Sequence, residues 1–388
     1  MREGWRAAKL GEVVRVERAS VPADRMPERV TLYSIPGLDR GVAPEVVPRA
    51  EIGSNKFRVD NQSVLVSMLN PRIPRTIVAS AGSYCSTEFA VVVPRESQVT
   101  IPYLALLVSS IEFTRALTQA AKGTTGSRAR CKASDLMAIT TPLASLADQR
   151  RIVDLMSALD DAIAAADTRP ARVAYDTLLS AYAARPEATP LSAAVSLKNG
   201  NQPVMPDGRY RIIGVLRSGE GFIDRGEIQG RDTGYPRLTQ IGTNELVYRK
   251  LTAWEGPISV STEAEAGGWV SPEFPIFTID ELVLRPGLMR HLCRWPGFWR
   301  SIGDRLVGSV QRRKRLNPDA LMNIELPMPS LDVQDTWLAT LDALWQEMSA
   351  ASTTLTTLRA LRSHVLTALL SGEHAIPESY DELMGVAS

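Results

Sequence analysis

The sequence has few cysteines and no long apolar run, and both absences exclude whole classes of protein. Its 388 residues include three cysteines, Cys85, Cys131 and Cys293, which are too few for a disulfide framework and lack the paired spacing of a zinc site. No stretch of 18 apolar residues occurs, so the sequence predicts no transmembrane helix. The N-terminus has no apolar core behind its charged residues. We therefore expect an unsecreted, cytoplasmic protein without membrane contact.

An excess of one charge and the common catalytic motifs are also absent. The 44 Lys plus Arg residues nearly cancel the 43 Asp plus Glu residues, so any basic surface must be local. No Gly-x-x-x-x-Gly-Lys-Ser/Thr loop occurs, which excludes an ATP-driven motor of the P-loop type. The lone pair His291 and Cys293 does not make a metal site. We expect no catalytic residue, metal or cofactor in this chain.

An internal repeat is the main positive feature of the sequence. At an offset of 185 residues, STEF (86–89) aligns with SPEF (271–274), and PLASLADQ (142–149) aligns with PMPSLDVQ (327–334). Arginines 128 and 130 align with arginines 313 and 315 at the same offset. Short runs such as FAVVVP (89–94) and FPIFTID (274–280) predict strands in each copy. One register held over this length indicates two copies of one structural plan.

Each copy leads into a predicted long helix with an apolar stripe. Ser145 and Asp148 match a capping box in front of the first helix. Apolar residues recur three and four apart, which is a heptad pattern; Arg362 is a charged exception in the second stripe. Pro170 should kink or restart the first helix. The predicted seam comprises Ile152, Met156, Leu159, Ile163, Leu341, Leu344, Met348, Leu355, Leu358, Val365 and Leu369.

These elements predict two α/β (α+β) globular domains in tandem repeat, separated by long antiparallel coiled-coil helices. A single apolar stripe usually packs on its own domain, but two stripes at matching positions most simply pack on each other. A helix of about forty residues spans roughly 60 Å, enough to act as a spacer. The predicted parts are a first domain at 1–144, a central helical spacer at 145–185, a second domain at 186–329, a distal helical spacer at 330–372 and a tail at 373–388.

Basic loops lie at equivalent places in the two copies and are candidates for phosphate contacts. A short basic run is usually only a solvated surface, but this one recurs with the repeat. We expect the repeated Glu88 and Glu273 to cap local backbone donors, and Tyr84 and Trp269 to lie in the core rather than line a groove. The candidates for DNA binding are Lys122, Thr124, Thr125, Ser127, Arg128, Arg130 and Lys132 in the first loop, Gln311, Arg312, Arg313, Lys314 and Arg315 in the second, and Arg72, Arg75, Arg249 and Lys250 nearby.

The order of parts resembles the specificity subunit of type I restriction-modification enzymes. The resemblance is carried by residues 140–167, TTPLASLADQRRIVDLMSALDDAIAAAD, and residues 358–373, LRALRSHVLTALLSGE. It implies a non-catalytic subunit of a bacterial or archaeal cell whose two target-recognition domains each read half of a split site in double-stranded DNA. It also implies two adenine methyltransferase subunits docked on the helices and motor-nuclease subunits beyond them. S-adenosylmethionine, ATP and magnesium would then belong to those partners.

Other functions remain open on the sequence alone. The chain has no Asn-Pro-Pro-aromatic motif, the motif that seats the target adenine in the methyltransferase itself; the nearest string is NPRI at 70–73. A nuclease would need acids clustered around a metal, and none is evident. A coiled-coil scaffold that binds protein through its globular halves is one alternative. A specificity subunit of a related phage-defence methylation system is another. The sequence does not identify the target bases or the residues that read them.

Overall fold

The structure is a computed structural model that describes residues 4–121, 129–186, 188–308 and 314–383. Its contacts divide the chain into two compact units. Unit 1 comprises residues 1–166 and 354–388, and unit 2 comprises residues 167–353. The predicted boundaries at 144, 185, 329 and 372 do not coincide with this division, because each unit includes parts of the long helices. The division into recognition domains and spacers therefore stays a prediction.

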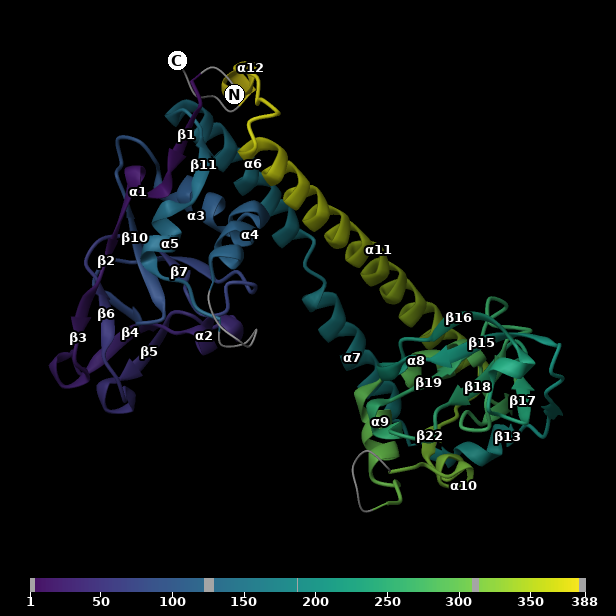
Figure 1. Ribbon diagram of the computed structural model, residues 1–388. Helices are drawn as coiled ribbons and strands as arrows, with labels where there is room; N and C mark the ends of the chain where they lie inside the picture. Colours follow the sequence, from purple (N-terminus) through teal and green to yellow (C-terminus); the bar gives the residue numbers. More distant parts are fainter. Residues whose placement is uncertain (1–3, 122–128, 187, 309–313, 384–388) are drawn as a thin grey trace. The chain divides into compact units, whose positions relative to one another are not determined.

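Unit 1 contains two antiparallel-rich sheets and a short two-stranded one (Figure 1). The four-stranded sheet has the order β2 (Val14–Glu17), β10 (Phe89–Pro94), β7 (Ser63–Ser67) and β8 (Thr76–Ala79). The five-stranded sheet has the order β3 (Ala19–Val21), β6 (Lys56–Val59), β9 (Ser83–Ser86), β4 (Arg29–Tyr33) and β5 (Glu45–Pro48), in which β4 and β9 are parallel. The third sheet pairs β1 (Arg6–Lys9) with β11 (Thr140–Leu143).

Unit 2 has sheets of the same sizes. The four-stranded sheet has the order β13 (Val195–Leu197), β21 (Ile276–Ile279), β18 (Glu245–Tyr248) and β19 (Ile258–Val260). The five-stranded sheet has the order β14 (Asn201–Pro203), β17 (Arg237–Gln240), β20 (Trp269–Val270), β15 (Arg209–Val215) and β16 (Phe222–Gln229). β12 (Ala188–Pro190) pairs with β22 (Glu325–Pro327). The one parallel contact again lies inside the five-stranded sheet, between β15 and β20.

Helices cover one face of each four-stranded sheet. Unit 1 has α1 (Leu10–Val13), α2 (Ile35–Asp39), α3 (Ile101–Ser109), α4 (Ile111–Ala120), α5 (Ala133–Ala138), α6 (Leu146–Ala165) and α12 (Ser379–Leu383). Unit 2 has α7 (Arg169–Ala183), α8 (Pro286–Cys293), α9 (Pro296–Gly303) and α10 (Pro318–Met322). α11 (Leu331–Leu370) is one helix of 40 residues, whose first part belongs to unit 2 and whose last part belongs to unit 1. The chain therefore has a mixed α/β fold, as predicted.

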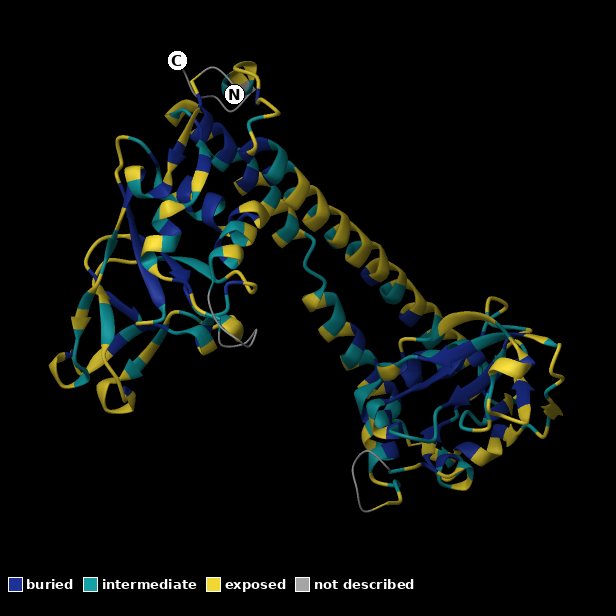
Figure 2. Cartoon of the chain, in the orientation of Figure 1, coloured by how far each residue is buried: buried dark blue, intermediate teal, exposed yellow. Residues whose placement is uncertain are grey.

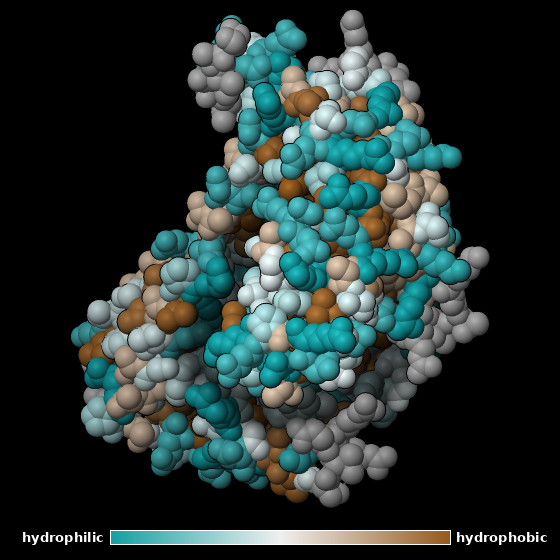
Figure 3. Space-filling view, turned by 90° about the vertical axis from the view of Figure 1, so that its left-hand side faces the viewer, coloured by the Kyte–Doolittle hydropathy of each residue, from teal (hydrophilic) through white to brown (hydrophobic). Residues whose placement is uncertain are grey.

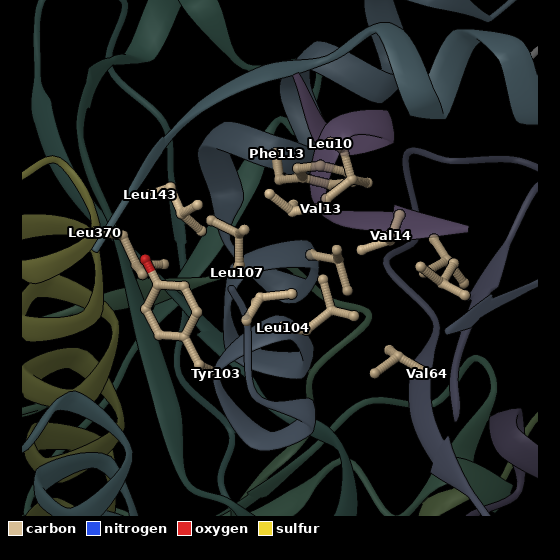
Figure 4. Close-up of a cluster of buried hydrophobic side chains, with 14 of the residues drawn as sticks. Leu10, Val13, Val14, Val64, Tyr103, Leu104, Leu107, Phe113, Leu143 and Leu370 are labelled. Atoms are coloured by element: carbon tan, nitrogen blue, oxygen red, sulfur yellow. The ribbon is translucent and has the colours of Figure 1, made fainter. Parts of the chain in front are cut away.

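Strand β10 shows why its sequence is a continuous apolar run. Phe89 and Val91 lie in a core cluster with residues of the five-stranded sheet, whereas Ala90 and Val92 lie in the larger cluster beneath the helices. Successive side chains of a strand point to opposite faces, so a strand in the middle layer must be apolar on both. Figure 4 shows the larger cluster, in which Leu370 of α11 lies beside Leu143 and Tyr103. The repeated aromatic residue Tyr84 is buried as expected, and Trp269 packs against Tyr210.

The predicted helix start and the predicted break both occur. Ser145 is the N-cap of α6, and its hydroxyl accepts a hydrogen bond from the backbone N–H of Asp148 at 3.1 Å. The first long helix ends at Ala165, and a second helix starts at Arg169 with Pro170 in its first turn. Proline suits a first turn because the N–H that it lacks has no partner there. The break is therefore a restart rather than a kink.

α11 lies antiparallel to its neighbour within each unit. In unit 1, Arg362 of α11 forms an ion pair with Asp160 of α6, which accounts for the charged exception in the predicted stripe. In unit 2, ring centroids lie 5.5 Å apart for Tyr175 and Trp345 and 5.6 Å apart for Tyr182 and Trp337. Figure 2 shows exposed residues along α11 interrupted by less exposed ones. The predicted seam residues of α6 and α11 are buried or half-buried, yet their assignment to a coiled coil stays a prediction.

The described part of the tail, residues 373–383, packs on unit 1. Ile376 is buried in the main core cluster of unit 1. Asp381 of α12 accepts hydrogen bonds from Arg151 of α6, the shortest 2.6 Å, and this contact holds the pKa of Asp381 below its usual value.

No helix in the described part of the chain combines the length and apolarity of a membrane span. On the face shown in Figure 3, hydrophobic residues form separate spots among hydrophilic ones.

A fully buried glutamine holds the start of each long helix. In unit 1, the Gln149 side chain donates hydrogen bonds to the carbonyl groups of Gln98 (2.9 Å) and Ala144 (3.0 Å) and accepts one from the Thr100 N–H (2.9 Å). In unit 2, Gln334 donates to Val283 (2.8 Å) and Pro329 (2.9 Å) and accepts from the Arg285 N–H (2.9 Å). One amide thus ties the helix start to the loop before α3 or α8 in both units.

Replacement of Gln334 by leucine should destabilise unit 2. Leucine leaves one N–H and two carbonyl groups buried without this partner, and we expect a loss of about 3 kcal/mol in the free energy of unfolding. Urea titration followed by tryptophan fluorescence measures this, because six of the seven tryptophans lie in unit 2. Gln346→Leu, an exposed position of the same helix, is the matched control. Equal unfolding midpoints for the two variants would contradict the role of Gln334.

A buried histidine links three helices of unit 2. His291 of α8 is within 2.7 Å of the Tyr175 hydroxyl through Nδ1 and within 2.8 Å of the Asp342 carboxylate through Nε2. Since a carboxylate only accepts, Nε2–H donates to Asp342, and in the neutral ring Nδ1 accepts from Tyr175. Burial lowers the pKa of His291 below its ordinary value of 6.5, although Asp342 opposes the shift. The neutral ring is therefore the form that the folded state holds.

Unit 2 should lose stability as the pH falls below about 7. The unfolded chain takes up a proton at His291 near its ordinary pKa, whereas the folded chain does so only at lower pH, so protons favour unfolding between the two values. The slope reaches at most about 1.4 kcal/mol per pH unit. Urea midpoints at pH 7.5 and 5.5 measure it. His291→Gln should flatten the dependence, and an unchanged slope in that variant would assign the effect to other groups.

Candidate nucleic-acid interface

The basic loops are described only at their ends. Lys122, Thr124, Thr125, Ser127 and Arg128 of the first loop, and Gln311, Arg312 and Arg313 of the second, lie outside the described residues. Their predicted DNA contacts therefore stay predictions. The described ends carry Arg130 and Lys132 in unit 1 and Lys314 and Arg315 in unit 2. These ends determine where each loop leaves the core.

The end of the first loop is anchored by an arginine and a glutamate. The Arg130 guanidinium donates two hydrogen bonds to the Glu88 carboxylate, at 2.9 and 3.2 Å. The backbone of Arg130 forms a bridge with Leu69, and the Asn70 N–H donates to the Ala129 carbonyl at 2.8 Å. A bidentate pair of this kind defines the orientation of both side chains. The loop thus leaves the core beside the segment that follows β7.

The second loop has the same anchor. Arg315 pairs with Glu273 at 3.3 Å, and its backbone bridges to Leu251, the residue equivalent to Leu69. The Thr252 N–H donates to the Lys314 carbonyl at 3.2 Å. The expectation that Glu88 and Glu273 cap backbone donors through their side chains was wrong for their described contacts, in which each carboxylate accepts from an arginine. Glutamate and arginine recur at one offset, and this joint recurrence was the signal for the pair.

Two of the other candidate arginines are engaged within the protein. The Arg75 guanidinium donates to the Asp39 carboxylate at 2.6 and 3.0 Å, and these hydrogen bonds lower the pKa of Asp39. Arg249 donates to the Leu251 carbonyl at 3.0 Å and to the Glu255 carboxylate at 2.8 Å. It therefore supports the turn at Thr252, which has a left-handed φ of 57° that is unfavourable for a β-branched residue. Sequence analysis missed Asp39 and Glu255 because nothing in the spacing pairs them with arginines.

Four candidates present charge without an ion pair among the described residues. Arg72 and Lys132 are exposed in unit 1, and Lys250 and Lys314 are half-buried in unit 2. In contrast to Arg75 and Arg249, none of the four is paired with a carboxylate in the described part of the chain. An unpaired cation near a loop end is available to a phosphate group, and each phosphate contact releases counterions from DNA.

The described side chains include neither a cluster of metal ligands nor an exposed thiol. No cluster of three or more His, Cys, Asp or Glu side chains that could hold a metal ion occurs among the described residues. All three cysteines are buried, and burial raises the pKa of Cys131 to about 11 and the pKa values of Cys85 and Cys293 to about 12. None of them is a thiolate near neutral pH, so none is a ready nucleophile.

One comparison with known proteins finds a family model that matches the first part of the chain. Residues 2–175 match the family model of the type I restriction modification DNA specificity domain. Residues 2–175 are therefore similar to this specificity domain. The match covers residues 2–166 of unit 1 and supports, for this part of the chain, the resemblance seen in the sequence. No curated protein matches the sequence.

Solved structures with the same fold come from type I systems. One is described as the structural basis of complex assembly and conformational transition of the type I R-M system; it is 18% identical, covers 96% of this chain and 99% of its own, and has a TM-score of 0.58. Another, the type I restriction-modification S subunit from M. genitalium, is 12% identical, covers 96% of this chain and 97% of its own, and has a TM-score of 0.59. At these identities the likeness shows the fold.

Neighbouring cations Arg249 and Lys250 should respond differently to substitution. Arg249→Ala removes the support of the Thr252 turn, so we expect a loss of about 1–2 kcal/mol in stability with an unchanged salt dependence of DNA binding. Lys250→Ala should leave stability unchanged and reduce the slope of log K against log salt by about one. Urea titration and fluorescence anisotropy with a duplex measure the two effects. The opposite pattern would show that Arg249, not Lys250, contacts phosphate.

Proposed function

We propose that this chain is the sequence-specific DNA-binding subunit of a type I restriction-modification complex and reads a bipartite target. The family match supports DNA specificity for residues 2–175. The observation that extends it to the second half is the recurrence of one loop anchor: Arg130 with Glu88 in unit 1, and Arg315 with Glu273 in unit 2. Each globular half would then read one half-site in the major groove, where all four base pairs are distinguishable.

The proposal also includes partners and a tandem-repeat architecture. Equal sheet sizes and matching strand orders in the two units support two recognition domains of one plan. The helices α6, α7 and α11 would form the antiparallel spacer that sets the distance between half-sites and docks two methyltransferase subunits. Motor-nuclease subunits would complete the complex. This chain would be a non-catalytic recognition subunit in the cytoplasm of a bacterium or archaeon, and S-adenosylmethionine, ATP and magnesium would be bound by its partners.

Deletion of the gene should abolish N6-methyladenine at one bipartite motif. Genome-wide mapping of methyladenine in the source organism, with and without the gene, measures this, and complementation with the wild-type gene should restore the motif. An unchanged methylome despite an expressed neighbouring methyltransferase would favour the protein-binding scaffold, which the family match does not favour.

A chimaera tests whether each domain reads one half. Exchange of residues 186–329 for those of a relative with a different target should change one half of the methylated motif and leave the other half intact. The reciprocal exchange of residues 1–144 is the matched control and should change the opposite half. A chimaera that methylates the original motif would show that the second globular domain does not read DNA.

A further inference from the structure

A pocket in unit 1 gathers three arginines from two distant parts of the sequence. It has a volume of about 350 Å³ and lies between the loop after β7, the start of α4 and the C-terminal part of α11. Arg72 comes from the loop, and Arg359 and Arg362 come from α11. Serine and threonine side chains line much of the remainder, and the described lining residues include no aspartate or glutamate. The pocket is therefore rich in donors and positive charge.

Only one of the three arginines has a carboxylate partner among the described residues. Arg362 pairs with Asp160 of α6, and its side chain is 28% exposed. Arg359 lies one turn earlier on α11, and residues three apart share a helix face. Arg359 and Arg72 are exposed and form no ion pair among the described residues. The Arg362 pair thus holds α11 against α6 within unit 1 and leaves two guanidinium groups of the pocket available.

The pocket adjoins the end of the first basic loop. Arg72 lies two residues beyond Asn70, whose N–H donates to the Ala129 carbonyl, and three residues beyond Leu69, which bridges to Arg130. The loop after β7 therefore contacts residues 129 and 130 at the end of the basic loop, and its Arg72 lines the pocket together with the α11 arginines.

We propose that Arg72 and Arg359 bind a backbone phosphate of duplex DNA in this pocket. Helix α11 then contacts DNA in addition to the contacts made by the loops. The proposal rests on the DNA-binding function proposed above. A guanidinium group offers paired N–H donors that match phosphate oxygens. The hydroxyl groups and the first turn of α4, which starts at Ile111, supply further donors at the same place. Phosphate contacts give affinity and register rather than base specificity.

The test uses the full chain, alone and in complex with its methyltransferase subunit. Fluorescence anisotropy with a duplex that carries the target and with a scrambled duplex gives Kd at several salt concentrations. The double variant Arg72→Ala/Arg359→Ala should bind both duplexes about tenfold more weakly near 0.1 M salt, and the slope of log K against log salt should fall by about one to two. The variant Arg359→Lys keeps the positive charge, so its slope of log K against log salt should be close to that of the wild type.

Arg18→Ala is the matched control, because Arg18 is an exposed arginine of unit 1 outside the pocket. Thermal unfolding should show that all variants fold equally well. A double variant that binds like Arg18→Ala would overturn the proposal while the proposed function stands. The proposal would also be overturned if the double variant bound DNA normally but no longer bound the methyltransferase. The same holds if it bound DNA normally but no longer bound inorganic pyrophosphate in calorimetry. If the wild type shows no salt-dependent duplex binding, the proposed function fails as well.

Discussion

The buried amides of Gln149 and Gln334 are the constraint on which the rest of this structure depends. Each long helix starts where a loop from the sheet returns, and both segments bring backbone groups to a glutamine side chain that is fully buried. A glutamine side chain can satisfy an N–H and two carbonyl groups at once, which no apolar residue can do. The helix direction relative to the sheet is then defined within each unit. Helices α6 and α11 both start at such a junction.

The sequence predicted the features that depend on local pattern. Strand β10, the N-cap Ser145 and the restart at Pro170 all follow from periodicity and backbone chemistry. Features that depend on pairing were missed, because the partners are distant: Asp39 lies 36 residues from Arg75, and Asp160 lies 202 residues from Arg362. The contact Glu88–Arg130 was within reach of sequence reasoning, since both residues repeat with the same offset. Pattern predicts elements, whereas ion pairs require the fold.

Charge in this protein is organised locally, which reconciles a nearly neutral chain with the DNA binding proposed above. Arg75, Arg130, Arg249 and Arg315 are neutralised by carboxylates and hold turns and loop ends in place. Arg72, Lys132 and Lys250 lie beside them without such partners among the described residues. Paired arginines thus position the backbone, and the cations beside them that lack such a partner are the candidates for the proposed phosphate contacts. Whether a basic residue is paired with a carboxylate depends on the folded geometry, so a count of basic residues does not reveal it.

The division of α11 between the units has a consequence for synthesis on the ribosome. Unit 2 is a continuous segment, whereas unit 1 joins residues 1–166 to residues 354–388. Its core cluster includes Leu366, Leu369, Leu370 and Ile376, which are translated last. Domains usually fold in the order in which they emerge. Unit 1, whose first residues are translated first, should therefore complete its folding last. Until residues 354–388 are translated, the apolar stripe of α6 lacks its α11 partner and is a surface that a chaperone can bind.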